Sequence, residues 1–147
     1  MRRIKRIVAG VVIMSFCFSN IVYAVGEKEE AKEYLEKLNP ILSQIDEAYR
    51  NVALKVLTLE IGASKIKELI NSLNSLTPPE FMEKQHKMIL LALKKMEAGF
   101  RLLARNDRSH AVSMVKRSAD LLKMAVNNII AFGKKEGIIK EQTVDKQ

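Results

Sequence analysis

The sequence has little of several residue types on which catalytic, metal and cofactor sites depend. It contains one cysteine, two histidines and no tryptophan in 147 residues. No C-x-x-C-H motif is present, which excludes covalently bound haem, and no nucleophile elbow brings a serine together with a histidine and an aspartate. Only 5% of the residues are aromatic, so the basic segments lack the interleaved rings of a nucleic-acid platform. We therefore expect a protein that is not an enzyme, holds no cofactor and binds no nucleic acid.

Strand patterns and glycine-rich phosphate loops are missing as well, and the chain has only six glycines and three prolines. Apolar residues recur instead at alternating spacings of four and three, which is the period of an amphipathic helix. The pattern predicts an all-α fold, an antiparallel up-down bundle of four helices. The bundle domain is expected to span residues 25–133, followed by a polar, disordered tail at residues 134–147.

The amino terminus has the pattern of an export signal. A basic start at residues 2–6 precedes an apolar run at residues 7–18, and Val22 and Ala24 occupy the two positions that a signal peptidase recognises. We predict residues 1–24 as a signal peptide, which places the protein in the periplasm or outside the cell. In the alternative, the segment stays attached as an anchor, since residues 7–25 are a nearly apolar stretch of 19 residues.

Removal of the signal changes both the charge and the redox chemistry of the chain. The formal charge of +8 includes four basic residues of the signal, so the remaining chain has 21 basic and 17 acidic residues, a net charge of +4. This charge is too small to argue for nucleic acid by itself. Cys17 leaves with the signal, so no disulfide is expected and the fold must depend on packing alone.

Two alternatives remain for the first half of the bundle. One apolar stripe predicts a helix at residues 27–57, with Pro40 on the outward side, and the stripe continues in register to Leu73. Either the chain turns near residues 58–63 and a second helix returns to Leu76, or residues 27–76 form one very long helix, possible in a dimer. We favour the turn, because a single helix would leave Leu35, Leu38 and Leu42 in water unless a second copy covered them.

The second half predicts two further helices. Thr77 followed by Pro78, Pro79 and Glu80 has the pattern of a capping box, so a helix is expected at residues 79–105. A short connection at residues 106–109 leads to a fourth helix that ends near Phe132, with Gly133 as the stop signal.

His86 is the most conspicuous single residue, because it lies on the apolar stripe of the third helix. With Glu83 it forms an E-x-x-H pair, which di-iron bundles use twice. The other histidine, His110, is expected about 30 Å away at the opposite end of that helix, so the two cannot share a metal. We interpret His86 as a partly buried residue that hydrogen-bonds to a neighbouring helix, and no metal ligands are expected. The alternative is a carrier of a small ligand or metal, with a pocket between helices near His86.

The charge distribution is more informative. Residues 80–105 and 106–134 each carry a net charge of +3, whereas residues 27–57 carry −2. The second half is therefore a basic hairpin, which either forms a solvated face or binds an anionic surface such as membrane headgroups or cell-wall polymers. We take as the candidate interaction surface Lys84, Lys87, Lys94, Lys95, Arg101, Arg105, Arg108, Lys116, Arg117 and Lys123.

Several short segments stand out together: Tyr34-Leu35, the run from Leu38 to Leu42, Pro78-Pro79-Glu80, His86 and Leu91-Ala92-Leu93. They resemble a pattern found in uncharacterised exported bacterial helical-bundle proteins. The resemblance implies an exported bacterial protein and brings no catalytic residues. We predict a non-enzymatic interaction or binding module of the cell envelope, either a monomer or a homodimer, with a protein or an anionic envelope component as partner.

Overall fold

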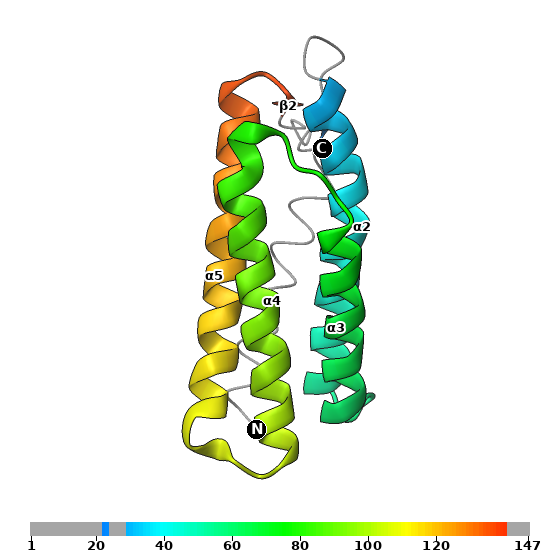
Figure 1. The fold of residues 1–147 in the computed structure, drawn as a ribbon, viewed down its shortest axis with the longest axis vertical. Coiled ribbons are helices and arrows are strands. Elements are labelled where there is room, and N and C mark those ends of the chain that lie inside the picture. The colour runs from blue at the N-terminus through cyan, green and yellow to red at the C-terminus, as the bar shows by residue number, and fades with distance from the viewer. Residues whose placement is uncertain (1–21, 24–28, 141–147) are drawn as a thin grey trace, which may run out of the picture.

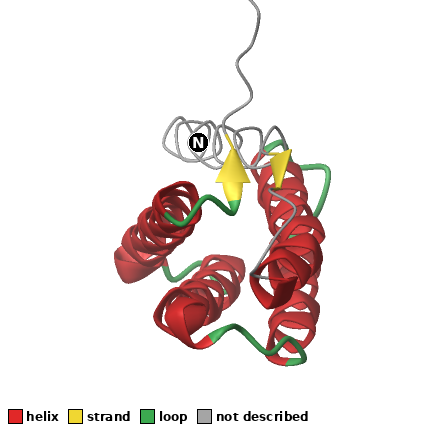
Figure 2. Ribbon diagram, turned by 90° about the horizontal axis from the view of Figure 1, so that it is seen from above, coloured by secondary structure: helices red, strands yellow, loops and turns green. Residues whose placement is uncertain are grey.

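The computed structural model of the chain describes residues 22–23 and 29–140. Four helices run alternately up and down one bundle: α2 (Glu29–Ala53), α3 (Leu59–Asn74), α4 (Glu83–Ala104) and α5 (Arg108–Lys135) (Figure 1). Each helix packs beside the next one in the sequence, and a view along the axes shows the four around a common centre (Figure 2). The predicted all-α bundle of four helices is confirmed.

The core comes from the apolar stripes that face inward on each helix. Side chains with at most 2% of their surface exposed come from all four helices, among them Leu35, Leu38, Ile45, Ile66, Leu73, Ile89, Leu93, Met96 and Leu122. Burying each such leucine or isoleucine contributes about 1.5–3 kcal/mol. Pro40 lies inside α2 and is exposed, as predicted, so the ring interrupts the helix on its solvent side.

The predicted turn between the first two helices is present, which excludes one long helix over residues 27–76. It lies earlier than expected, because α2 ends at Ala53 rather than near residue 57. Lys55 adopts a left-handed conformation with φ 60°, and the amides of Lys55 and Val56 donate to the carbonyls of Val52 and Asn51. These two hydrogen bonds, with the left-handed residue, define a Schellman motif. Thr58 then caps α3 by accepting from the amide of Ile61 at 3.2 Å.

The prediction that Thr77 caps the third helix is wrong. The chain enters that helix through a single 3-10 turn, η1 (Glu80–Met82). The buried Pro79 precedes this turn at the N-cap position, and no side chain caps either η1 or α4. Two consecutive prolines hold Pro78 out of the helical region, so the helix begins after the second one. The regular α-helix therefore starts at Glu83.

The carboxyl end also differs from the prediction. Helix α5 passes the expected stop at Gly133, which is buried, and ends at Lys135. Gly137, with φ 71°, closes another Schellman motif, and the next residue, Ile138, is 5% exposed. The segment expected to be a polar, disordered tail is thus folded as far as Lys140, because Ile138 reaches the core.

Two very short strands join the ends of the described chain. Strand β1 (Val22–Tyr23) pairs antiparallel with β2 (Ile139–Lys140), on the side of the bundle between α2 and α5 (Figure 2). The sequence predicts no strand here. Because Val22 and Tyr23 belong to the predicted signal peptide, cleavage after Ala24 would remove β1. The apolar run at residues 7–18 and the expected cleavage site lie outside the described residues.

Helices α4 and α5 have the most extensive contact of any pair in the bundle. Gly99 on α4 leaves no room for a side chain: a Cβ added there would come within 2.5 Å of Val115 Cγ2 and within 3.4 Å of the backbone of Ala111. Just before α4 begins, the ring of Phe81 in η1 stacks on that of Phe132 in α5, with centroids 4.7 Å apart. The pair is thus in contact near both ends.

Candidate functional site

The side chain of His86 lies between α4 and α2. It is 6% exposed, and its Nδ1 is 2.8 Å from the hydroxyl of Tyr34 on α2, which is 3% exposed. The two rings are tilted, with centroids 5.7 Å apart. His86 hydrogen-bonds to a neighbouring helix, as the sequence predicts, and it is buried rather than partly buried.

Burial sets the charge state of this pair. It lowers the pKa of His86, because a charged imidazolium loses its hydration there, and it raises the pKa of Tyr34 for the same reason. Both side chains are therefore neutral near pH 7. When Tyr34 donates its hydroxyl proton to Nδ1, the imidazole keeps its own proton on Nε2.

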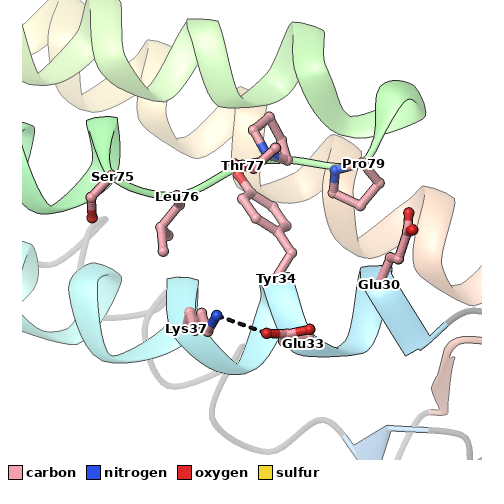
Figure 3. A pocket seen from close by; sticks show the side chains of 9 residues that line it. Glu30, Glu33, Tyr34, Lys37, Ser75, Leu76, Thr77 and Pro79 are labelled. Atoms are coloured by element: carbon pink, nitrogen blue, oxygen red, sulfur yellow. Dashed lines mark hydrogen bonds and ion pairs between the residues drawn. The ribbon is translucent and has the colours of Figure 1, made fainter.

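A shallow groove lies on the outer side of Tyr34. It has a volume of about 410 Å³ and is lined by the first turns of α2 and by the loop that leads into η1, including Glu30, Glu33, Lys37 and residues 75–79. Lys37 and Glu33 form an ion pair at 2.8 Å along its edge (Figure 3). Tyr34 lines this groove and hydrogen-bonds to His86, which does not line it.

The E-x-x-H pair does not form a metal site in the described part of the chain. Glu83 is exposed and pairs with Lys87 at 2.8 Å, whereas His86 points into the bundle. Within residues 29–138 no three His, Cys, Asp or Glu side chains come close enough together to hold a metal ion. His110 lies at the start of α5, at the opposite end of α4 from His86, as predicted, and it is exposed.

Two further polar groups are buried in α2. Asp46 is 5% exposed and forms an ion pair with Arg50 at 2.7 Å, but its Oδ1 has no hydrogen-bond partner among the described residues, nor has the hydroxyl of Tyr49. Burial raises the pKa of Asp46, and the nearby Arg50 opposes that shift. Burial also raises the pKa of Tyr49, with a smaller contribution from Asp120 on α5. Such unpartnered groups cost stability, and the sequence contained no signal for them.

The structure brings the predicted basic residues together on the outer sides of α4 and α5. Of the ten, nine are exposed and Arg101 is half-buried. Only two belong to an ion pair within the described chain: Lys87 with Glu83, and Arg101 with Glu97 at 3.1 Å. The other eight therefore present unneutralised charge to solvent.

Sequence reasoning missed Tyr34 as the partner of His86. The signal was present, because Tyr34 lies four residues before Leu38 and seven before Ile41, which puts it on the inward side of α2. What the sequence could not show is which residue of α4 lies opposite it, since that depends on how the helices are offset along their axes.

No helix within the described residues is both long enough and apolar enough to cross a membrane.

The fold defines the chain as a four-helix bundle. No protein-family model, curated protein or solved structure matches it.

Proposed function

We propose that the chain is an exported, non-enzymatic interaction module of the bacterial cell envelope, which binds an anionic envelope component through the basic α4–α5 hairpin. The observation that supports the proposal most is the set of eight basic side chains on the hairpin without an ion pair in the described chain. The fold does not need them, because the core is formed by the inward stripes. Their charge is available to a partner.

The contrast with the rest of the bundle supports the same proposal. The exposed sides of α2 carry Glu29, Glu30, Glu33, Glu36 and Glu47. An anionic surface would therefore be attracted to the α4–α5 side and repelled by α2. Such a distribution orients the molecule as it approaches a charged partner.

Binding to anionic material tests the proposal. Retention of the purified protein on anionic vesicles or on cell-wall polymers is expected at low salt and should fall as the ionic strength rises, because exposed charges are screened. Replacing Lys94, Lys116 and Lys123 by Gln should weaken retention, while replacing Lys65 and Lys67 of α3 should change it little. Retention that is indifferent to salt would contradict the proposal.

Export is tested separately. The protein should appear in the periplasmic or extracellular fraction of a bacterial culture, and mass spectrometry of the purified chain should give Val25 as the first residue. A chain that keeps residues 1–24 and sediments with membranes would support the anchored alternative.

A small-ligand or metal carrier is the second candidate, and the groove beside Tyr34 favours it. A ligand there would touch Tyr34 and so reach His86 through one hydrogen bond. Metal analysis of the purified protein, with His86→Gln as the control, tests it. Absence of bound metal, together with no change in stability on adding metal or candidate ligands, would end it.

A further inference from the structure

One outer face of the α4–α5 pair combines apolar and basic side chains. On α4, Lys84, Met88, Leu91 and Lys95 follow one another at spacings of four, three and four, so they lie on one side of the helix. Met88 precedes Gly99 by eleven residues, which puts this row at the edge of the contact with α5.

A matching row lies on α5. Arg117, Leu121 and Met124 have the same spacing of four and three. Leu121 precedes Phe132 by eleven residues, so this row lies at the edge of the side of α5 that contacts Phe81 of η1, next to the start of α4. The two helices are antiparallel, so each step forward from a contact on α4 corresponds to a step backward on α5. By this count Met88 lies level with Met124, and Leu91 lies level with Leu121. We call the two rows together the α4–α5 outer face.

The apolar side chains of this face are not fully covered by the bundle. Leu91 is 48% exposed and Met124 is 53% exposed, while Met88 and Leu121 are half-buried. Partly covered apolar groups on adjacent helices form a continuous strip that gains free energy when it leaves water.

The charged side chains next to the strip are mostly basic. Lys84, Lys95 and Arg117 border it, and none of them pairs with a carboxylate in the part of the chain that the structure describes. The two glutamates of α4, Glu83 and Glu97, are engaged with Lys87 and Arg101. Neither row contains an acidic residue. The exposed Asp120 of α5 lies beside the second row, three residues after Arg117 and four before Met124, and it is flanked by Lys116 and Lys123.

We propose that the α4–α5 outer face binds the surface of an anionic phospholipid bilayer. This inference rests on the function proposed above and names the partner and the contacting face. Leu91 and Met124 enter the boundary between headgroups and acyl chains, while Lys84, Lys95 and Arg117 extend their long stems and contact the phosphates. A fluid bilayer accepts leucine and methionine side chains without a shaped pocket. That property favours lipid over an acidic protein as the partner.

The test uses a fluorescent reporter on each side of the molecule. Because the chain has no tryptophan, Leu91→Trp introduces a single one. Vesicles of phosphatidylglycerol and phosphatidylcholine should shift its emission to shorter wavelength, and pure phosphatidylcholine vesicles should not. Leu54→Trp is the matched control, since Leu54 is 57% exposed at the α2–α3 turn, outside the face. Its emission should stay unchanged.

Binding of charge variants completes the test. The double substitution Leu91→Glu and Met124→Glu should weaken vesicle binding by about tenfold, because it removes two inserted groups and adds repulsion. Leu54→Glu with Val56→Glu, at positions that are 57% and 68% exposed in the α2–α3 turn, should have little effect. All variants share the same amino terminus, so any contribution of residues 1–28 is equal among them.

The outcomes distinguish the two proposals. Binding could be salt-sensitive while both tryptophans respond alike and both double variants bind alike. That result would overturn the lipid-binding face and leave the basic hairpin as an electrostatic binder. Binding to an envelope protein but not to protein-free vesicles would also overturn it, in favour of a protein partner. No binding to any anionic material would refute the proposed function itself.

Discussion

At the residue scale, the Tyr34–His86 pair couples the stability of the bundle to pH. The lowered pKa of His86 means that the folded protein takes up a proton less readily than the unfolded chain does. Above the ordinary histidine pKa of 6.5 the contribution of this group to stability is complete, and it is lost as the pH falls through the folded-state pKa. The buried imidazole therefore makes the stability of the bundle sensitive to acid.

We therefore expect the free energy of unfolding to decrease between pH 7 and pH 5. Urea unfolding at both pH values measures it, and the decrease should be smaller in His86→Gln. His110→Gln is the control, because His110 is exposed and should leave the decrease unchanged. Equal pH dependence in wild type and His86→Gln would contradict the assignment.

A second residue-scale prediction concerns two of the three Schellman motifs in the described chain, which have Lys55, Asn106 and Gly137 in the left-handed position. Lys55 pays a steric cost at φ 60°, whereas Gly137 at φ 71° pays none. Lys55→Gly should stabilise the protein by about 0.5–1 kcal/mol. Gly137→Ala should destabilise it by about 1 kcal/mol, although a Cβ there meets no neighbouring atom. Thermal unfolding of both variants should show shifts of opposite sign.

At the element scale, the close approach of α4 and α5 depends on Gly99. An alanine there would overlap Val115, whose β-branched side chain has one favoured rotamer in a helix and cannot move aside cheaply. Overpacking of this kind costs about 1–3 kcal/mol, against a gain of about 1 kcal/mol in helix propensity. We expect Gly99→Ala to destabilise the protein.

A double-mutant cycle isolates the cause. In Gly99→Ala with Val115→Ala, the overlapping methyl group is gone, so the combined loss should be smaller than the sum of the two single losses by about 1 kcal/mol or more. Denaturant titration of the four proteins gives these values. Simple additivity would show that the two residues do not interact as the structure indicates.

At the scale of the whole molecule, one chain covers its own core. Leu35, Leu38 and Leu42, which one long helix would have exposed, are at most 6% exposed in the single chain. The bundle needs no second copy for this purpose, and its longest helix, α5, is about 42 Å long.

We therefore expect light scattering of the purified protein to give the mass of one chain, and small-angle X-ray scattering to give a maximum dimension close to that of one bundle. A mass of two chains with an elongated profile would point to an exchange of helices between copies.

Much of this fold could be predicted from the sequence, because spacings of four and three along a chain fix which side of each helix is apolar. The helical class, the inward side of α2 and the outward position of Pro40 follow from that periodicity alone. The basic character of α4 and α5 could also be predicted, because the net charge of a segment is counted from its own residues. The ends of the helices were predicted less well. Thr77 was expected to cap the helix at residues 79–105 and does not, whereas Thr58 caps α3 without having been predicted to.

Only the tertiary structure decided which residues of different helices meet. The pairing of Tyr34 with His86, the contact of Gly99 with Val115 and the burial of Ile138 all depend on the offset between helices. That offset is chosen by the packing of whole stripes at once. No local pattern encodes it, because the free energy that selects it is shared among many side chains far apart in the sequence.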